Sequence, residues 1–241
     1  MMTEELFRED ASLLRCDARV VGHGEGGVLL DRTVCYPLGG GQAGDTGWLA
    51  AGVQRWRIAD TRKSKERPGA IVHIVEGQDF PAVGAAVTVE VDAARRQAHR
   101  RFHTATHLLC ALLPYPVDGC SITEAYARLD FHTDQPIDKD AIQAGLQRLV
   151  AEAHPVRHRW ISEEELDANP GLVRSMSVQP PRGLGRVRVL EVEGVDLQPC
   201  GGTHVANTAE IGAVVVTKIE KKSAKTRRVV LGFAEPAAGQ G

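Results

Sequence analysis

Two pairs of metal-binding residue types, far apart in the sequence, constrain the fold of this 241-residue chain more than any other feature. The first pair is His103 and His107. Apolar residues around them recur at steps of three and four, which predicts an α-helix that Pro114 ends: Ala98, Phe102, Ala105, Leu109 and Leu112. Residues four apart lie on the same face of a helix, so both imidazoles can reach one ion.

The second pair is Cys200 and His204, which two glycines and a threonine separate. A Gly-Gly turn is flexible enough to point the thiolate and the imidazole the same way. Four nitrogen and sulfur ligands in two pairs are what tetrahedral zinc prefers, so we expect one Zn²⁺ ion on these four residues. A metalloprotease of the HExxH kind is excluded, because the residues between His103 and His107 include no glutamate.

The hydrophobic pattern changes near Asp92, and this predicts two domains, residues 1–92 and 93–241. The first contains short β segments between Gly-rich turns, as in a small barrel or a sandwich: 18–22, 27–37, 53–60, 70–75 and 87–91. The second begins with the histidine helix, has helix starts at Asp138 and Ser162, and then returns to strands at 187–193, 211–220 and 226–233. We therefore expect an α+β fold, in which an N-terminal barrel precedes an antiparallel sheet packed on helices.

Composition and charge narrow the class of protein. The chain has 43% hydrophobic residues and no apolar run near the roughly 20 residues that span a bilayer, so we expect no membrane association. Five widely spaced cysteines, an odd number, are typical of a reducing cytoplasm. The net charge of −2 gives no overall attraction to nucleic acid, but basic residues gather in two places: Arg95, Arg96, Arg100 and Arg101, and then Lys218, Lys221, Lys222, Lys225, Arg227 and Arg228.

A glycine-rich stretch, YPLGGGQAGDTG at residues 36–47, has more glycine than a hairpin needs. It contains one of two formal GxGxxG matches, but neither match leads into a predicted helix, which disfavours a dinucleotide-binding loop. Two interpretations stay open. The stretch is a structural loop, or it supplies amide donors, with Gln42 at its tip, to the metal pocket.

Four blocks together resemble one family. They are YPLGGGQAGDTG (36–47), RFHTATHLL (101–109), ARLDF (127–131) and CGGTHVANTAEIG (200–212), followed by the basic KIEKKSAKTRRV (218–229). In this order they resemble the medium form of the AlaX-type trans-editing proteins, whose editing domain is shared with alanyl-tRNA synthetase and related to that of threonyl-tRNA synthetase. The resemblance implies a glycine-motif barrel domain, 1–92, before a zinc-binding editing domain, 93–241.

The resemblance also implies roles for individual residues. Zinc is held by the four ligands already named, and Gln42 is a catalytic residue close to the aminoacyl ester. Ser121 is a candidate for the substrate pocket, and the acceptor end of the tRNA is contacted by Lys222, Lys225, Arg227 and Arg228. The implied activity is hydrolysis of mischarged tRNA(Ala), with Ser-tRNA(Ala) as the first expected substrate and Gly-tRNA(Ala) as a second, and without an obligate protein partner.

Two other functions are compatible with parts of this pattern. A zinc-stabilised RNA-binding module would use the same four ligands only to hold two chain segments together, and would bind tRNA without turnover. A zinc hydrolase acting on a small metabolite ester would have no use for the basic stretches, and its activity would be insensitive to salt.

Overall fold

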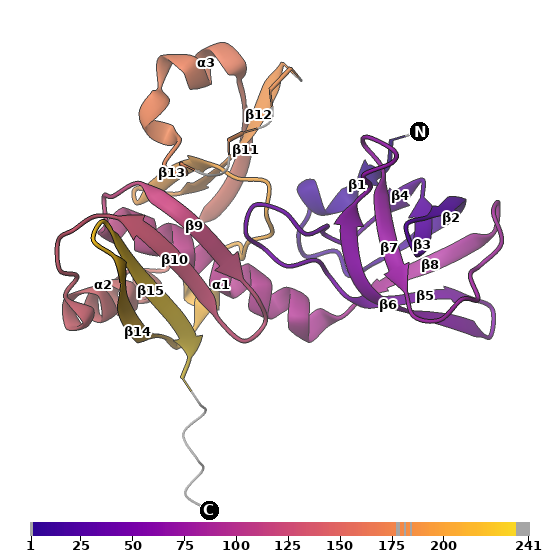
Figure 1. Cartoon of the computed structure of the whole chain (residues 1–241), viewed down its shortest axis with the longest axis horizontal. Coiled ribbons are helices and arrows are strands. Elements are labelled where there is room, and N and C mark those ends of the chain that lie inside the picture. The colour runs from indigo at the N-terminus through magenta and orange to yellow at the C-terminus, as the bar shows by residue number, and fades with distance from the viewer. Residues whose placement is uncertain (1, 177–178, 181, 184, 235–241) are drawn as a thin grey trace, which may run out of the picture. The chain divides into compact units, whose positions relative to one another are not determined.

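The protein is described by a computed structural model at residues 2–176, 179–180, 182–183 and 185–234, and it forms two compact units, 1–99 and 100–241 (Figure 1). The predicted α+β class with an N-terminal barrel is confirmed. The division lies inside helix α1 (Ala93–Leu112), somewhat after the predicted boundary, because the start of α1 is anchored in the first unit by Arg96. Within the described ranges, no helix is long and apolar enough to cross a membrane.

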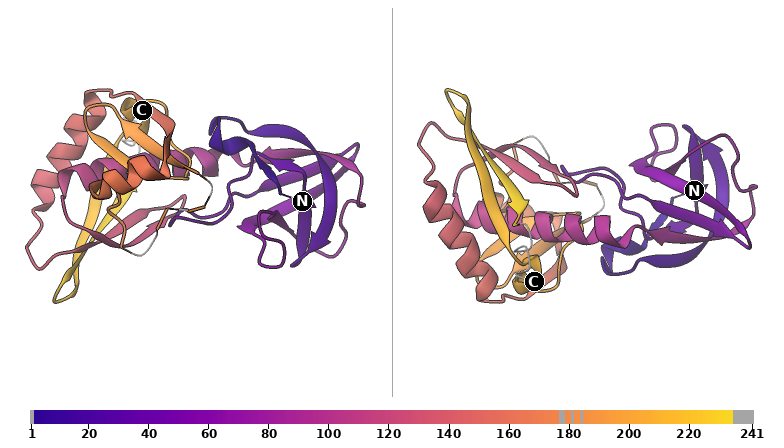
Figure 2. Two further views of the ribbon diagram at one scale, coloured as in Figure 1. Left: turned by 90° about the horizontal axis from the view of Figure 1, so that it is seen from above. Right: turned by 90° about the horizontal axis from the view of Figure 1, so that it is seen from below.

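The first unit is a closed antiparallel barrel with the strand order β2-β3-β7-β6-β5-β8 (Figure 2). Its interior is filled by alternate residues of each strand, and in β8 these are Val87, Val89 and Val91. The barrel strands are β2 (Arg15–Gly24), β3 (Gly27–Leu30), β5 (Gly47–Ala51), β6 (Gln54–Lys63), β7 (Ile71–Val75) and β8 (Ala86–Val91). Outside the barrel, the 3-10 turn η1 (Leu6–Arg8) lies next to β1 (Glu4–Glu5), which pairs in parallel with β4 (Arg32–Thr33).

The second unit contains two antiparallel sheets. The larger has the order β14-β15-β10-β9 and shares a core with α1 and α2 (Lys139–Ala151). Its strands are β9 (Val117–Ile122), β10 (Ala127–His132), β14 (Val214–Ser223) and β15 (Thr226–Phe233). The smaller sheet has the order β11-β12-β13, and its strands are β11 (Val156–Ser162), β12 (Arg186–Val192) and β13 (Asp196–Pro199). The remaining elements of this unit are short helices: α3 (Glu163–Ala168), η2 (Pro170–Leu172) and η3 (Thr208–Ile211).

Local signals for the helices agree with the structure more closely than those for the strands. Asp138 caps α2 by accepting hydrogen bonds from two backbone amides, and Ser162 caps α3 by accepting from the Glu165 amide. The strand expected at 27–37 is divided into β3, which ends at Leu30, and β4, which leaves the barrel to pair with β1. The strand expected at 211–220 begins only at Val214, because the preceding residues form η3. Strands β1, β5, β9, β10, β11 and β13 were not predicted.

Candidate metal centre

Helix α1 positions the first two candidate ligands. His103 and His107 are 5% and 6% exposed, and their rings lie on one face with centroids 5.7 Å apart. Phe102, Ala105 and Leu109 are fully buried in the core of the second unit, which fixes the rotation of the helix about its axis. The spacing predicted from the sequence therefore places both imidazoles on the same side.

The other two candidate ligands follow β13. Cys200 Sγ lies 3.5 Å from His103 Nε2 and 3.2 Å from His204 Nε2. One ligand atom from each of His103, His107, Cys200 and His204 lies within 4.8 Å of the others. Two contacts hold the loop against α1: Arg100 Nε donates to the His204 carbonyl at 2.8 Å, and the Val205 amide donates to Thr104 Oγ1 at 3.2 Å. The structure thus brings together two pairs that are far apart in the sequence.

The geometry of this cluster fits zinc. With Zn–N near 2.0–2.1 Å and Zn–S near 2.3 Å, tetrahedral coordination separates a nitrogen and a sulfur ligand by about 3.6 Å. The two separations at Cys200 Sγ are close to this value. Three imidazoles and one thiol also suit zinc, whereas magnesium and calcium prefer oxygen ligands.

Electrostatics favour the thiolate form of the cysteine. Burial alone would raise the pKa of Cys200, but the nearby His103 and His204 outweigh it and hold that pKa well below the usual value. Burial lowers the pKa of His204, and the neighbouring histidines lower it further. Burial also opposes the charged form of His107, yet hydrogen bonds to Asp196 and Cys200 raise its pKa to about 10. A thiolate ligand is what metal binding requires.

Asp196 is a functional candidate that the sequence analysis missed. Its Oδ2 lies 2.8 Å from His107 Nδ1 and accepts a second hydrogen bond from Gln198 Nε2 at 2.8 Å. A carboxylate at Nδ1 fixes the imidazole so that Nε2 faces the ion. A signal was present in the sequence: Asp196, Gln198 and Cys200 are alternate residues at β13, and alternate residues of a strand share one face.

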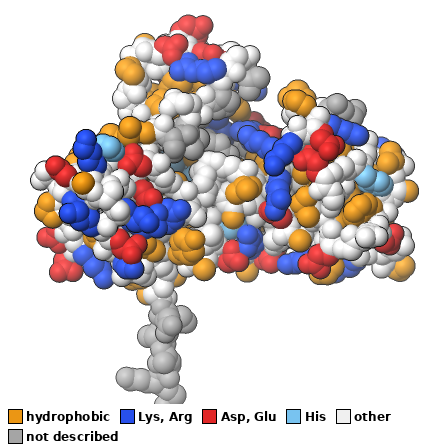
Figure 3. All heavy atoms as spheres, in the orientation of Figure 1, with side chains coloured by type: hydrophobic (Ala, Val, Ile, Leu, Met, Phe, Trp, Pro, Cys, Tyr) orange, Lys and Arg blue, Asp and Glu red, His pale blue; other side chains and the backbone are white. Residues whose placement is uncertain are grey.

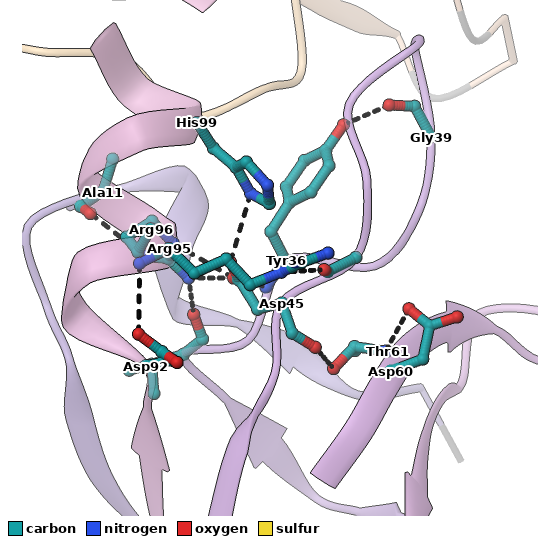
Figure 4. Close-up of polar contacts among 12 residues, drawn as sticks. Ala11, Tyr36, Gly39, Asp45, Asp60, Thr61, Asp92, Arg95, Arg96 and His99 are labelled. Atoms are coloured by element: carbon teal, nitrogen blue, oxygen red, sulfur yellow. Dashed lines mark hydrogen bonds and ion pairs between the residues drawn. The ribbon is translucent and has the colours of Figure 1, made fainter. Parts of the chain in front are cut away.

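The glycine-rich loop belongs to the first unit (Figure 4). Its tip is closed by two backbone hydrogen bonds between Gly39 and Gln42, at 3.1 and 3.0 Å. Gly40 and Gly41 have φ values of 58° and 83°, which glycine adopts without strain. Gln42 is fully buried, and its catalytic role stays a prediction.

A buried ion pair fixes the base of this loop. Arg96 and Asp45 are 1% and 0% exposed, and Arg96 also donates to backbone carbonyls of Ala11 and Val34 (Figure 4). Burial would raise the pKa of Asp45, but the charge of Arg96 outweighs it and lowers that pKa. The Asp45 carboxylate in turn accepts from the Tyr36 amide at 2.6 Å, so one pair connects α1 to both ends of the loop.

Ser121, the candidate for the substrate pocket, lies on β9 opposite Arg128 of β10. Its neighbour Cys120 lies opposite Leu129, a core residue, and packs against the core that includes α1. Burial raises the pKa of Cys120 to about 12, and nearby Cys110 and Cys200 add to this rise. Since adjacent strand residues point to opposite faces, Cys120 and not Ser121 points toward the side of the sheet that carries α1. The role of Ser121 stays a prediction.

The predicted tRNA-binding residues lie on the β14–β15 hairpin, over which Lys and Arg side chains gather in Figure 3. They fall into two groups. Lys222 and Lys225 are exposed near the turn. Arg228 is bound to Asp130 by two hydrogen bonds of 2.6 and 2.8 Å, and Arg227 donates to the carbonyls of Ser223 and Asp134. The lysines are therefore more available to a ligand than the arginines.

Known proteins are similar to this chain in both of its units. Residues 187–230 match the family described as "Threonyl and Alanyl tRNA synthetase second additional domain", and residues 11–95 match "tRNA synthetases class II (A)". The alanine–tRNA ligases of Ignicoccus hospitalis and Thermofilum pendens are 32% and 35% identical over 91% and 98% of this chain. The chain spans 24% and 26% of the length of these two ligases.

A relative of the same size decides the family. The alanyl-tRNA editing protein AlaX-M of Saccharolobus solfataricus is 33% identical over 240 residues, which cover 95% of this chain and 98% of the relative. The alignment therefore includes both the glycine-rich loop and the ligand cluster. On this evidence the chain belongs to the AlaX-type alanyl-tRNA editing proteins.

Proposed function

We propose that the protein is an aminoacyl-tRNA deacylase that hydrolyses the ester of mischarged tRNA(Ala). One observation carries the proposal: the four ligand residues converge in the unit whose sequence matches a tRNA synthetase editing domain. The AlaX-M relative, whose name gives alanyl-tRNA editing as its role, supports the same conclusion. Five free cysteines support a reducing compartment, and we propose the cytoplasm.

The chain's own residues supply positioning and electrostatic stabilisation in this proposal. Bound zinc would supply a positive charge that orients the aminoacyl group or a water molecule. Asp196 and Thr104 contact the Nδ1 atoms of His107 and His204, and so hold both rings in one orientation. Gln42 and amides of the glycine-rich loop are proposed to stabilise the oxyanion of ester hydrolysis.

The proposed substrates are Ser-tRNA(Ala) first and Gly-tRNA(Ala) second. A synthetase pocket that accepts alanine cannot strongly exclude amino acids of similar size by binding alone, so a separate hydrolytic site is useful. A pocket that hydrogen-bonds a serine hydroxyl leaves polar groups unpaired when alanine enters, at a cost of about 1–3 kcal/mol each. Correct Ala-tRNA(Ala) is spared for this reason.

The test is release of amino acid from Ser-, Gly- and Ala-tRNA(Ala) by the purified protein. We expect rapid loss of serine, slower loss of glycine and none of alanine. His103→Ala should abolish release, whereas His132→Ala, which removes an exposed histidine of the same unit, should not. Equal release of all three amino acids, or full activity of His103→Ala, would contradict the proposal.

A zinc-stabilised RNA-binding module is the second candidate. The observation that favours it is the number of protein ligands, because four normally close a zinc site and leave no position for water. This module would bind tRNA tightly and release none of the three amino acids. The same experiment therefore separates the two functions.

A further inference from the structure

The surface of the barrel unit has a hollow of about 360 Å³ that is distant in sequence from the metal ligands. Its apolar lining comes from Leu38, Val72 and Ile74. Leu38 is 52% exposed, and its amide donates to the Thr61 carbonyl at 2.8 Å. The glycine-rich loop, through Leu38, is thus one border of the hollow.

The polar lining is mainly basic. Arg62 and Lys63 end strand β6, Lys65 follows in the β6–β7 loop, and all three are exposed. Arg62 pairs with Asp60 at 2.6 Å, whereas neither lysine forms an ion pair with any described residue. Figure 3 shows Lys and Arg side chains gathered over β6. Three basic side chains therefore lie around one carboxylate at this place.

Glu25, the one acidic residue that lines the hollow, stabilises the β6–β7 loop. Glu25 accepts hydrogen bonds from the Ser64 hydroxyl and from the amides of Lys65 and Glu66, at 3.0 and 3.3 Å for the amides. These bonds hold Glu25 itself at a φ of 54°, which residues other than glycine rarely adopt. Its carboxylate therefore faces the loop backbone and fixes the loop that carries Lys65.

We propose that this hollow is a second tRNA contact, in which Lys63 and Lys65 bind the phosphodiester backbone of the tRNA. The inference rests on the proposed function, since it assumes that tRNA is the substrate. Charge complementarity identifies the ligand class: exposed cations beside the exposed side chain of Leu38 fit phosphates and the sugars between them. The contact carries no sequence information and adds affinity to that of the β14–β15 hairpin.

The test uses the full chain with Lys63→Gln and Lys65→Gln combined. A matched control combines Arg15→Gln and Arg32→Gln, which remove two exposed charges of the same unit outside the hollow. Affinity for uncharged full-length tRNA(Ala) is measured from 50 to 200 mM salt, together with kcat and KM for Ser-tRNA(Ala). We expect the lysine variant to bind on the order of tenfold more weakly, and its salt slope to fall by about one for each lysine. The KM should rise while kcat is unchanged.

The outcomes separate this inference from the proposed function. If the lysine variant matches the control in affinity and salt slope while the unchanged protein edits normally, the contact does not exist. If both pairs of substitutions weaken binding equally, the effect is one of net charge and the inference is again wrong. If the unchanged protein binds tRNA but releases no amino acid, the proposed function fails while the binding data still test the contact.

Discussion

At the scale of single residues, Asp196 is the candidate that the structure reveals, through its contact with the ligand His107. We predict that Asp196→Asn weakens zinc binding about 10- to 100-fold, because the neutral amide no longer strengthens His107 as a ligand. The measurement is competition with a chelator of known affinity. The control is Asp130→Asn, which removes the carboxylate partner of Arg228 in the other sheet. Equal zinc affinity in Asp196→Asn and the unchanged protein would show that Asp196 does not tune the site.

His73 gives a second prediction at this scale, concerning stability and pH. It is fully buried in the barrel unit, between Thr33 Oγ1 at 2.8 Å and the Val28 carbonyl at 3.2 Å. Burial lowers its pKa from 6.5 to about 4. Between these values the unfolded chain binds a proton that the folded protein does not, so stability is complete above pH 6.5 and is lost as the pH falls.

We expect the titration of His73 to lower the free energy of unfolding by about 3 kcal/mol between pH 6.5 and pH 4. The measurement is unfolding by urea at several pH values, followed by a spectroscopic signal from the barrel unit. His73→Gln, which does not titrate, should be less stable at pH 7 but should show a flatter dependence over this range. An unchanged pH dependence in that variant would assign the acid sensitivity to other groups.

At the scale of elements, the glycine-rich loop shows which of its glycines the fold requires. A Cβ at Gly44 would lie 2.2 Å from the Thr61 carbonyl oxygen, whereas one at Gly39 would have no atom closer than 3.6 Å. We predict that Gly44→Ala costs about 1–3 kcal/mol, as overpacking does, and that Gly39→Ala changes stability by less than about 0.5 kcal/mol. Thermal unfolding of both variants checks this, and similar losses in the two would contradict it.

The elements also show what the sequence could and could not predict. Helix α1 was predictable because its apolar residues and ligands share one strong helical period, and the caps at Asp138 and Ser162 are local signals. Strand β9 was missed because its sequence, VDGCSI, has polar residues and a glycine where alternation would be apolar. Its pairing with β10 is decided by packing against the core, and that is not visible in a short window.

The site was predictable to a similar extent. The ligand types and their spacing pointed to one ion, whereas nothing in the sequence pointed to the buried pair of Arg96 and Asp45. Arg96 stood out in the sequence only as one member of a basic cluster. Its burial depends on carbonyl groups from Ala11 and Val34, and contacts of that range follow from the tertiary fold and not from spacing.

At the scale of the whole molecule, the two compact units allow metal removal to be followed in each of them. All four candidate ligands lie in the second unit. A chelator should therefore lower the unfolding temperature of that unit and leave the barrel's unchanged, because ligand binding stabilises only the part that binds. Differential scanning calorimetry with and without chelator is the measurement. His103→Ala should be insensitive to the chelator, and a fall in both unfolding temperatures would show that the units do not unfold separately.

The distance in sequence between the ligand pairs also has a consequence for the order of folding. During synthesis from the N-terminus, every barrel strand up to Val91 is made before His103, and His204 follows about a hundred residues later. The histidine pair alone offers only half of a coordination shell. The four candidate ligands are complete only after β9 to β13 have been made, so we expect metal capture to be a late step that completes the second unit. A cell short of zinc would then accumulate chains with a finished barrel and an unfinished editing unit.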